Sequence, residues 1–332
     1  MFASCRRKPA PNKAVIRSRR VLWNPACAAA TIGLFLFQFA VFGVLAFALS
    51  AQGAEITGTD DRGRTVTLPA PAQRIVALAP SITELAYAAG AGDRLVGVAR
   101  YSDYPAAAKG IPQVGDASRI DLERVLSLRP DLVIGWKSGN QVADIERLET
   151  LGFKVYVVEP ATLAAIPQLL RAVGSLAGSG AIAQGAADEF ERRVAALRER
   201  YGARPKVRVF YEIWHTPLMT VNGRHMISDV IRLCGGTNVF AGLATLTPVV
   251  SLEGVIALQP EVVLGGSSAT TPDEFSAQWR SYEKFVGLRN VRAMYVDPDY
   301  IQRQTPRILQ GAQTVCEHLE QIRSSRSNGR MG

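Results

Sequence analysis

Aromatic and charged side chains follow several stretches of this sequence that read as buried β-strands. Aromatic faces cover flat apolar rings, and an acid–base pair binds the hydrogen-bonding edges of a ligand. In open α/β sheets, ligands bind beyond the carboxyl ends of the strands. We therefore predict a binding site for a large, flat, partly apolar ligand. Its predicted ligand-binding residues are Tyr101, Trp136, Trp214, Asp299, Tyr300 and Arg303, with Tyr104 nearby.

Each of these residues also has a plainer interpretation. Tyr101 could pack against its own domain as a loop aromatic. Trp136 could belong to a core, although Lys137 beside it favours an exposed strand end. Asp299 and Arg303 are four positions apart and could form a surface ion pair, which contributes only tenths of a kcal/mol.

The sequence offers little for catalysis. It contains neither a Gly-x-Ser-x-Gly motif nor a Gly-Lys-Ser/Thr phosphate loop. Its histidines, His215, His225 and His318, do not have the spacing of metal ligands. His215, next to Trp214, is the only candidate axial ligand for a haem iron. We expect a binding protein rather than an enzyme, with no catalytic residues, no metal site and no cofactor.

Strand-like and helix-like stretches alternate along the chain, which predicts an α/β fold with doubly wound parallel sheets. Residues 74–79 form a continuous apolar run, as parallel strands do. The following Ser81 and Glu84 have the spacing of a capping box, which predicts a helix from Ser81 to about Gly90.

An internal repeat divides the chain into two lobes. Residues 120–135 match residues 250–265 in a Leu-Glu pair, a Leu-x-Pro-acid segment and a Val-x-Gly ending. Residues 81–90 match 226–235 more weakly and in the same order. The repeat predicts lobes at residues 55–180 and 202–323. The alternative is two unrelated βα units that share a common exit sequence.

A single long helix, residues 181–201, is predicted between the lobes. Apolar residues recur in it every three or four positions, which places them on one face. These residues are Ile182, Ala186, Phe190, Val194, Leu197 and Tyr201. Gly202 and Pro205 end the helix. Beyond the second lobe, residues 324–332 are predicted to be a disordered tail.

The first 54 residues resemble a targeting segment. A basic region precedes an apolar run at residues 28–49, and small residues follow at Ala48-Leu49-Ser50 and Ala51-Gln52-Gly53. The paired Arg19 and Arg20 leave a twin-arginine signal open. The run is long enough to span a bilayer, so an uncleaved anchor is the alternative to a signal peptide. Either way, the rest of the chain is expected to be exported to the periplasm.

Net charge gives no reason to expect a nucleic-acid partner. The formal charge is +9, but seven basic residues precede Glu55, the first acidic residue, and removing them leaves +2. The body of the protein is therefore nearly neutral. The exported part keeps two cysteines, Cys234 and Cys316. In an oxidising compartment a disulfide is the simplest interpretation, and two buried free thiols are the alternative.

Several motifs together resemble the periplasmic substrate-binding proteins of ABC importers for cobalamin, haem and iron-siderophores. The opening pattern is Asp60-x-x-Gly63-Arg64-x-Val66-x-Leu68-Pro69, followed by Arg74-Ile75-Val76-x-Leu78-x-Pro80-x-x-Thr83-Glu84. The resemblance covers residues 55 to about 323 and is greatest to the cobalamin binders. Four segments carry that likeness: Tyr101–Pro105, Leu132–Trp136, Cys234–Gly236 and Asp299–Arg307.

The resemblance implies specific roles. Tyr101 and Trp136 would line the corrin site, and Asp299 and Arg303 would contact amides of the ligand. Glu123 and Glu253 would pair with arginines of the importer's permease dimer, which works with ATPase subunits. In the alternative interpretation these two glutamates only favour the helix dipole near helix starts. The cysteine positions match the disulfide of the cobalamin binders, and we expect a monomer.

This sequence departs from the cobalamin binders at two aromatic positions, which are Ala117 and Thr247 here. Trp214 would compensate from a neighbouring position. A haem-binding or siderophore-binding protein of the same family is therefore the first alternative function, and a membrane-anchored ligand-sensing domain is the second.

Overall fold

The computed structural model describes residues 55–116, 118–267, 269–283, 285, 288 and 291–328. The chain divides into two units, Met1–Gly53 and Ala54–Gly332, and every described residue lies in the second. The predicted targeting segment and Ala117 lie outside the described residues. Among the described helices, none is both long and apolar enough to cross a membrane.

The first lobe contains a four-stranded parallel sheet with the order β4-β3-β7-β8. These strands are β3 (Ile75–Ala77), β4 (Leu95–Val98), β7 (Leu132–Trp136) and β8 (Val155–Val158). Two small antiparallel pairs accompany the sheet: β1 (Ile56–Thr59) with β2 (Thr65–Leu68), and β5 (Gly115–Asp116) with β6 (Arg119–Ile120). The helices are α2 (Pro80–Ala88), η1 (Gly92–Arg94), η2 (Ala106–Gly110), α3 (Leu122–Leu128), α4 (Val142–Thr150) and α5 (Ala165–Ala177).

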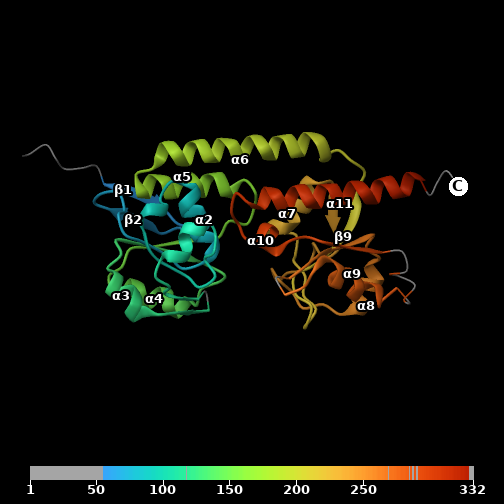
Figure 1. The fold of residues 1–332 in the computed structure, drawn as a ribbon, viewed down its shortest axis with the longest axis horizontal. Helices are drawn as coiled ribbons and strands as arrows, with labels where there is room; N and C mark the ends of the chain where they lie inside the picture. The colour runs from blue at the N-terminus through green and yellow to red at the C-terminus, as the bar shows by residue number, and fades with distance from the viewer. Residues whose placement is uncertain are drawn as a thin grey trace, which may run out of the picture. The chain divides into compact units, whose positions relative to one another are not determined.

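The second lobe repeats this plan with the order β10-β9-β11-β12, again parallel throughout. Its strands are β9 (Val207–Glu212), β10 (Gly236–Asn238), β11 (Val262–Gly265) and β12 (Arg292–Tyr295). Its helices are α7 (Met226–Leu233), α8 (Leu252–Leu258), α9 (Pro272–Arg280), α10 (Pro298–Ile301) and α11 (Ile308–Asn328). Between the lobes lies α6 (Gly180–Tyr201), the long yellow-green helix of Figure 1. The predicted fold class, two doubly wound lobes joined by one helix, is confirmed.

In each four-stranded sheet, the strand that comes second in the chain lies at one edge, next to the strand that comes first. The third and fourth strands follow on the other side of the first. The repeat detected in the sequence therefore corresponds to a repeat of topology. Its two copies are also alike in detail, because α3 and α8 both end in a left-handed residue that is not glycine, Arg129 (φ 46°) and Gln259 (φ 45°).

The acid of the Leu-x-Pro-acid segment makes equivalent hydrogen bonds in the two lobes. The Asp131 carboxylate accepts the backbone N–H of Arg74 at 3.0 Å, and the Arg74 side chain donates to the last carbonyls of α3. In the second lobe, Glu261 accepts the N–H of Arg208 at 2.8 Å, and the Arg208 side chain donates to the carbonyl of Leu258 at the end of α8. The acid thus joins the third strand of each sheet to the first, and the arginine satisfies carbonyls that the helix leaves unpaired.

Both faces of each sheet are buried. In β3, Ile75 and Ala77 pack with α2 and α5, whereas Val76 packs on the other face with α3 and α4. In the second lobe, β9 alternates in the same way between a face covered by α7 and α11 and a face covered by α8 and α9. This arrangement leaves the carboxyl ends of the strands free to carry functional residues.

The buried face of α6 differs from the predicted one near its start. Phe190, Val194 and Tyr201 are buried as expected, but Ile182 is 60 % exposed. Ala183 takes its place, because α6 packs closely on α5 at Gly174, where a Cβ would lie 2.2 Å from the Ala183 methyl group. This close approach turns Ala183 inward and Ile182 outward.

Two further predictions need correction. Helix α2 begins after Ala79 without any side-chain cap, so Ser81 and Glu84 do not form a capping box, and Glu84 has partners in the other lobe instead. Helix α11 continues to Asn328, so the predicted disordered tail from residue 324 is helical at its start. The buried face of α11 includes Ile308, Ala312, Val315, Cys316, Leu319 and Ile322.

Candidate functional site

A cavity of about 350 Å³ lies between the two lobes. The first lobe contributes Trp136 at the end of β7 and Glu159 just after β8. The second lobe contributes residues from four segments of the chain, and these include Ile213, His225, Thr247 and Gln302 with Gln304. Of the six predicted ligand-binding residues, only Trp136 lines this cavity.

The local sequence fixes how Trp136 stands at the cavity. Its backbone N–H donates to Asn140 Oδ1 at 2.7 Å, and Asn140 Nδ2 donates to the carbonyl of Leu78 at 3.0 Å. The ring lies over Gly139, where a Cβ would come within 1.8 Å of it. The ring is half-buried and packs against the core.

The indole Nε1 of Trp136 is buried without a hydrogen-bond partner among the described residues. A buried donor left unpaired costs about 1–3 kcal/mol, so most such groups in folded proteins have a partner.

Two of the other predicted aromatics, Tyr101 and Trp214, are open to solvent. Tyr101, just after β4, is 68 % exposed and adopts the left-handed conformation (φ 69°). Trp214, just after β9, is 58 % exposed, and its Nε1 donates to the carbonyl of Thr216 at 2.9 Å. Neither ring is buried in a core, so the plainer interpretation of Tyr101 as a packed loop aromatic does not hold.

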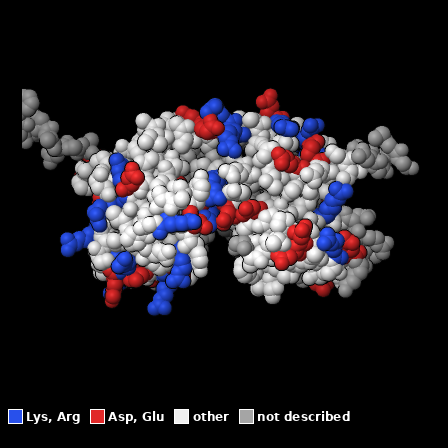
Figure 2. All heavy atoms as spheres, in the orientation of Figure 1, with Lys and Arg blue, Asp and Glu red and all other residues white. Residues whose placement is uncertain are grey.

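Arg303 is the centre of an ion cluster between the lobes. It contacts Glu84 at 2.9 Å and Asp103 at 2.8 Å in the first lobe, and Asp299 at 3.0 Å in its own lobe. The side chain of Arg303 is only 16 % exposed. Asp299 and Arg303 are therefore paired, but the pair belongs to a larger, partly buried network rather than to a simple surface contact. Figure 2 shows acidic and basic side chains together where the lobes meet.

Glu84 anchors this cluster from α2. It is 3 % exposed, and it accepts hydrogen bonds from Thr305 Oγ1 at 2.9 Å and from Arg307 Nη1 at 3.1 Å, besides that from Arg303. Sequence reasoning did not predict this role. Glu84, Thr305 and Arg307 stood in the motifs quoted for the family resemblance, but nothing in the sequence indicated that they contact one another.

Two tyrosines pack around Arg307. Its guanidinium carbon lies 4.0 Å from the centre of the Tyr104 ring and 4.8 Å from that of Tyr300. Such cation–π contacts are favourable when the pair is shielded from water. The Tyr300 ring, predicted to bind ligand, thus has a protein partner in this structure.

Burial and ion pairing act on the cluster in opposite directions. Burial alone would raise the pKa of Asp103, but its hydrogen bond and ion pair with Arg303 outweigh burial and lower that pKa overall. Burial alone would lower the pKa of Arg303, and its contacts with Asp103, Glu84 and Asp299 raise it instead. Asp103 and Arg303 are therefore both ionised at neutral pH.

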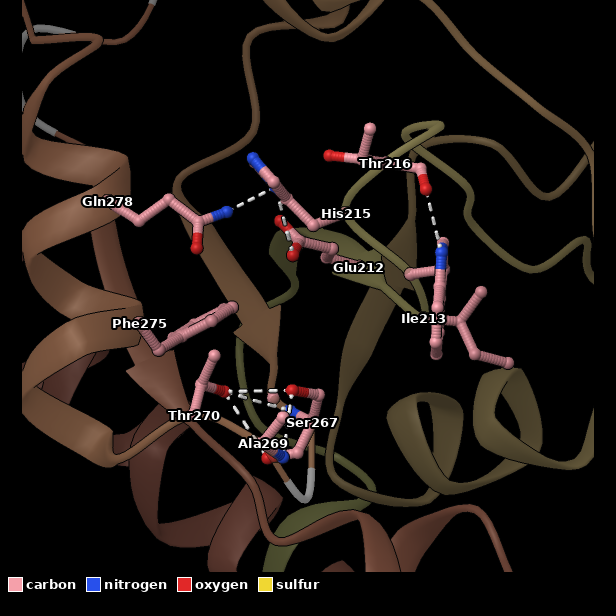
Figure 3. A pocket seen from close by; sticks show the side chains of 11 residues that line it. Glu212, Ile213, His215, Thr216, Ser267, Ala269, Thr270, Phe275 and Gln278 are labelled. Atoms are coloured by element: carbon pink, nitrogen blue, oxygen red, sulfur yellow. Dashed lines mark hydrogen bonds and ion pairs between the residues drawn. The ribbon is translucent and has the colours of Figure 1, made fainter.

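A second cavity, of about 260 Å³, lies at the carboxyl ends of the strands of the second lobe (Figure 3). Glu212 forms its floor, accepts Trp279 Nε1–H at 2.6 Å and lies 3.3 Å from His215 Nδ1. Burial raises the pKa of Glu212, and His215 and Trp279 only partly offset this effect. Trp214 lines this cavity, and Ile213 lines both cavities, so the two are neighbours.

The two predicted docking residues occupy equivalent places. Glu123 and Glu253 are exposed in the first turns of α3 and α8, behind the N-caps Asp121 and Ser251. In Figure 1 both helices lie at the edge of their lobe away from α6. The backbone N–H of Glu253 and the Ser251 hydroxyl lower the pKa of the Glu253 carboxyl, so this residue also supports its helix start.

The predicted disulfide is present. Cys234, after α7, and Cys316, in α11, are bonded at an S–S distance of 2.04 Å, and both residues are fully buried. The bond joins two helices that cover the same face of the second sheet.

Thr247 lines the cavity between the lobes, so the departure from an aromatic residue that the resemblance implied falls in the wall of this cavity. Trp214, proposed from the sequence to compensate, lines the neighbouring cavity instead. The wall of the cavity near Thr247 is therefore formed by smaller and more polar groups than the resemblance implied.

Comparison with known proteins agrees with this geometry. The chain is 39 % identical over 256 residues to the vitamin B12-binding protein of Vibrio parahaemolyticus, covering 77 % of this chain and 92 % of that protein. The crystal structure of the periplasmic vitamin B12 binding protein BtuF of Vibrio cholerae matches with a TM-score of 0.70 and 35 % identity, covering 76 % of this chain and 98 % of BtuF.

A haem-binding protein is a more distant neighbour. The periplasmic haem-binding protein RhuT of Roseiflexus matches with a TM-score of 0.63 and 26 % identity, covering 74 % of this chain and 97 % of RhuT. The family model described as periplasmic binding protein matches residues 75–300, which span both lobes and α6. With its two repeated lobes and the cavity between them, this chain belongs to the periplasmic binding protein family.

Proposed function

We propose that this chain captures cobalamin between its lobes and delivers it to an ABC importer. The observation that carries the proposal is the cavity at Trp136, which combines this aromatic residue with the amide side chains of Gln302 and Gln304. A corrin ring has flat apolar faces that suit the tryptophan and a rim of amides that suits the two glutamines. The similarity to vitamin B12-binding proteins supports the same ligand.

The site extends beyond the cavity in this proposal. Ligand pockets commonly have volumes of about 300–1,000 Å³, and a cavity of 350 Å³ holds only part of a corrinoid. The exposed rings of Tyr101 and Trp214 would cover apolar surface of the ligand outside it. Asp299 retains an exposed carboxylate edge, with 44 % of its side chain accessible, which suits an amide N–H of the ligand.

Delivery rests on the repeated lobes. Glu123 and Glu253 are exposed at equivalent positions of the two lobes, as a partner with two-fold symmetry requires. We infer that a permease dimer, driven by ATPase subunits, receives a monomer of this protein in the periplasm. In this proposal the chain performs no chemistry on the ligand.

Haem is the second candidate, favoured by one observation. His215 is 41 % exposed and is held at Nδ1 beside the buried Glu212, as metal-binding histidines commonly are held by carboxylates. The discriminating experiment is to follow tryptophan fluorescence while cyanocobalamin, haemin and a ferric hydroxamate are added separately. Our proposal predicts saturable quenching by cyanocobalamin at the lowest concentration of the three. Preferential saturation by haemin would support the alternative.

A further inference from the structure

His225 occupies an unusual place, because it caps a helix and lines the cavity between the lobes at the same time. It is the N-cap residue of α7, and its ring Nδ1 accepts the backbone N–H of Ile227 at 3.2 Å. The same side chain lines the cavity, together with Trp136 and Thr247. N-caps are usually Ser, Thr, Asp or Asn, whose short side chains would not reach far from the helix.

The cap fixes the position of the imidazole proton. A backbone N–H can only donate, so Nδ1 must carry a lone pair. A neutral ring with a lone pair on Nδ1 carries its proton on Nε2. Burial lowers the pKa of His225 to about 4, so the ring is neutral at the pH of an external compartment.

The remaining nitrogen is a hydrogen-bond donor without a partner among the described residues. The ring of His225 makes no other hydrogen bond to a described residue, and Nε2 is not among the buried unpaired atoms. Since Nδ1 faces α7, Nε2 on the opposite side of the ring is the polar atom that can face the cavity. Gln302 and Gln304 line the same cavity, so its second-lobe wall carries several polar groups around this donor.

We propose that His225 is a specificity-determining residue that donates its Nε2–H to an acceptor oxygen of the bound corrinoid. This inference rests on the proposed function. Thr247, a short side chain, lines the same cavity as His225. The acceptor is either an amide carbonyl on the corrin rim or the phosphate of the nucleotide loop.

The same geometry excludes His225 as a ligand of the central metal. A metal bond needs a lone pair on Nε2, so the proton would have to move to Nδ1. The proton on Nδ1 would then oppose the N–H of Ile227, and the cap of α7 would be lost. His225 therefore contacts the periphery of the ligand and does not bind its metal.

The test compares two variants that differ only in the cap. In His225→Ser the hydroxyl retains the cap and the imidazole donor is removed, whereas His225→Ala removes both. We expect His225→Ser to keep the wild-type melting temperature and to bind cyanocobalamin roughly five- to tenfold more weakly, as the loss of one hydrogen bond implies. His225→Ala should lose the same affinity and also melt at a lower temperature.

The two acceptors are separated by titrating dicyanocobinamide, which retains the amides but lacks the nucleotide loop. An equal loss of affinity for both compounds identifies an amide carbonyl, and a loss confined to cyanocobalamin identifies the phosphate. Aquocobalamin should bind without a band shift that depends on His225, because His225 does not replace its axial water.

Two results would overturn the inference. One is binding of both corrinoids by folded His225→Ser within twofold of the wild type. The other is a shift of the aquocobalamin bands that disappears in His225→Ser, which would show metal ligation. Failure of the proposed function gives a different result, since wild-type protein would then bind neither corrinoid.

Discussion

Arg303, just after α10, donates through Nη1 to Oε1 of Glu84 in α2 at 2.9 Å, although the two residues are 219 positions apart in the chain. The contact joins the second lobe to the first, and Thr305 and Arg307 reach the same carboxylate. The relative position of the lobes thus depends on one buried acid with three donors, in addition to α6.

Replacing Glu84 should destabilise the protein strongly. Glu84→Gln removes the charge that two arginines share, and breaking a buried ion pair on one side costs about 3–5 kcal/mol. We expect the free energy of unfolding in urea to fall by about 3 kcal/mol, within the range known for such changes. The matched control is Glu123→Gln at an exposed glutamate, which should change it very little. Equal stabilities for the two variants would contradict the role given to Glu84.

Stability should also decrease in acid. Burial alone would raise the pKa values of Asp60 and Asp103, but hydrogen bonds and arginine contacts lower both overall. A carboxyl whose folded pKa lies below its unfolded pKa stabilises the protein above the unfolded value, near 4 (about 3.9 for Asp). That stability is lost as the pH falls through the lower folded pKa values.

Urea unfolding measured between pH 7 and pH 2.5 checks this expectation. The free energy of unfolding should begin to decrease below about pH 6.5, because burial lowers the pKa of His225 to about 4, and should decrease further below about pH 4 as Asp60 and Asp103 are protonated. Asp103→Asn should reduce the size of that decrease. A free energy of unfolding that rises as the pH falls from 5 to 3 would contradict the lowered pKa values of Asp60 and Asp103.

The disulfide should contribute substantially to the second lobe. Cys234 and Cys316 are 82 positions apart, and closing a loop of that length stabilises a protein by about 3–5 kcal/mol in the chain-entropy model. Thiol titration of denatured, unreduced protein should find neither residue free, and the Cys234→Ala/Cys316→Ala variant should melt at a distinctly lower temperature. Two titratable thiols would show that the bond does not form.

Removing the two exposed glutamates should affect transport and not binding. Glu123→Ala/Glu253→Ala removes carboxylates that would meet permease arginines, and such rim charges govern register and encounter more than affinity. We expect unchanged cobalamin binding and a sharp decrease in uptake by cells, or in stimulation of the transporter ATPase in vesicles. If the double variant supports normal transport, both residues serve only their helix starts, as the contact between Glu253 and Ser251 already suggests for one of them.

The sequence predicted features that depend on local pattern or on repetition. The repeat at residues 120–135 and 250–265 anticipated two sheets with the same strand order, because equal segments form equal βα units. The two cysteines of the exported part anticipated the disulfide because no other partner was available.

Features that depend on distant contacts could not be predicted in this way. Ser81 and Glu84 have the spacing of a capping box, but the arginines of the other lobe outcompete the helix start for the Glu84 carboxylate. The periodicity of α6 predicted that Ile182 faces inward. Close packing at Gly174 places Ala183 there instead and leaves Ile182 exposed. His225 had no metal-binding spacing, and only the fold shows that it lines a cavity.

The central claim is that cobalamin is the ligand and that it binds at Trp136, between the lobes. Calorimetric titration of the exported protein with cyanocobalamin tests it most directly, with haemin as the competing ligand and folded Trp136→Ala as the variant. We predict one cobalamin per protein, a submicromolar dissociation constant, and at least tenfold weaker binding by Trp136→Ala, within the range for loss of a large interface aromatic. No heat with cyanocobalamin, together with saturable binding of haemin, would contradict the account.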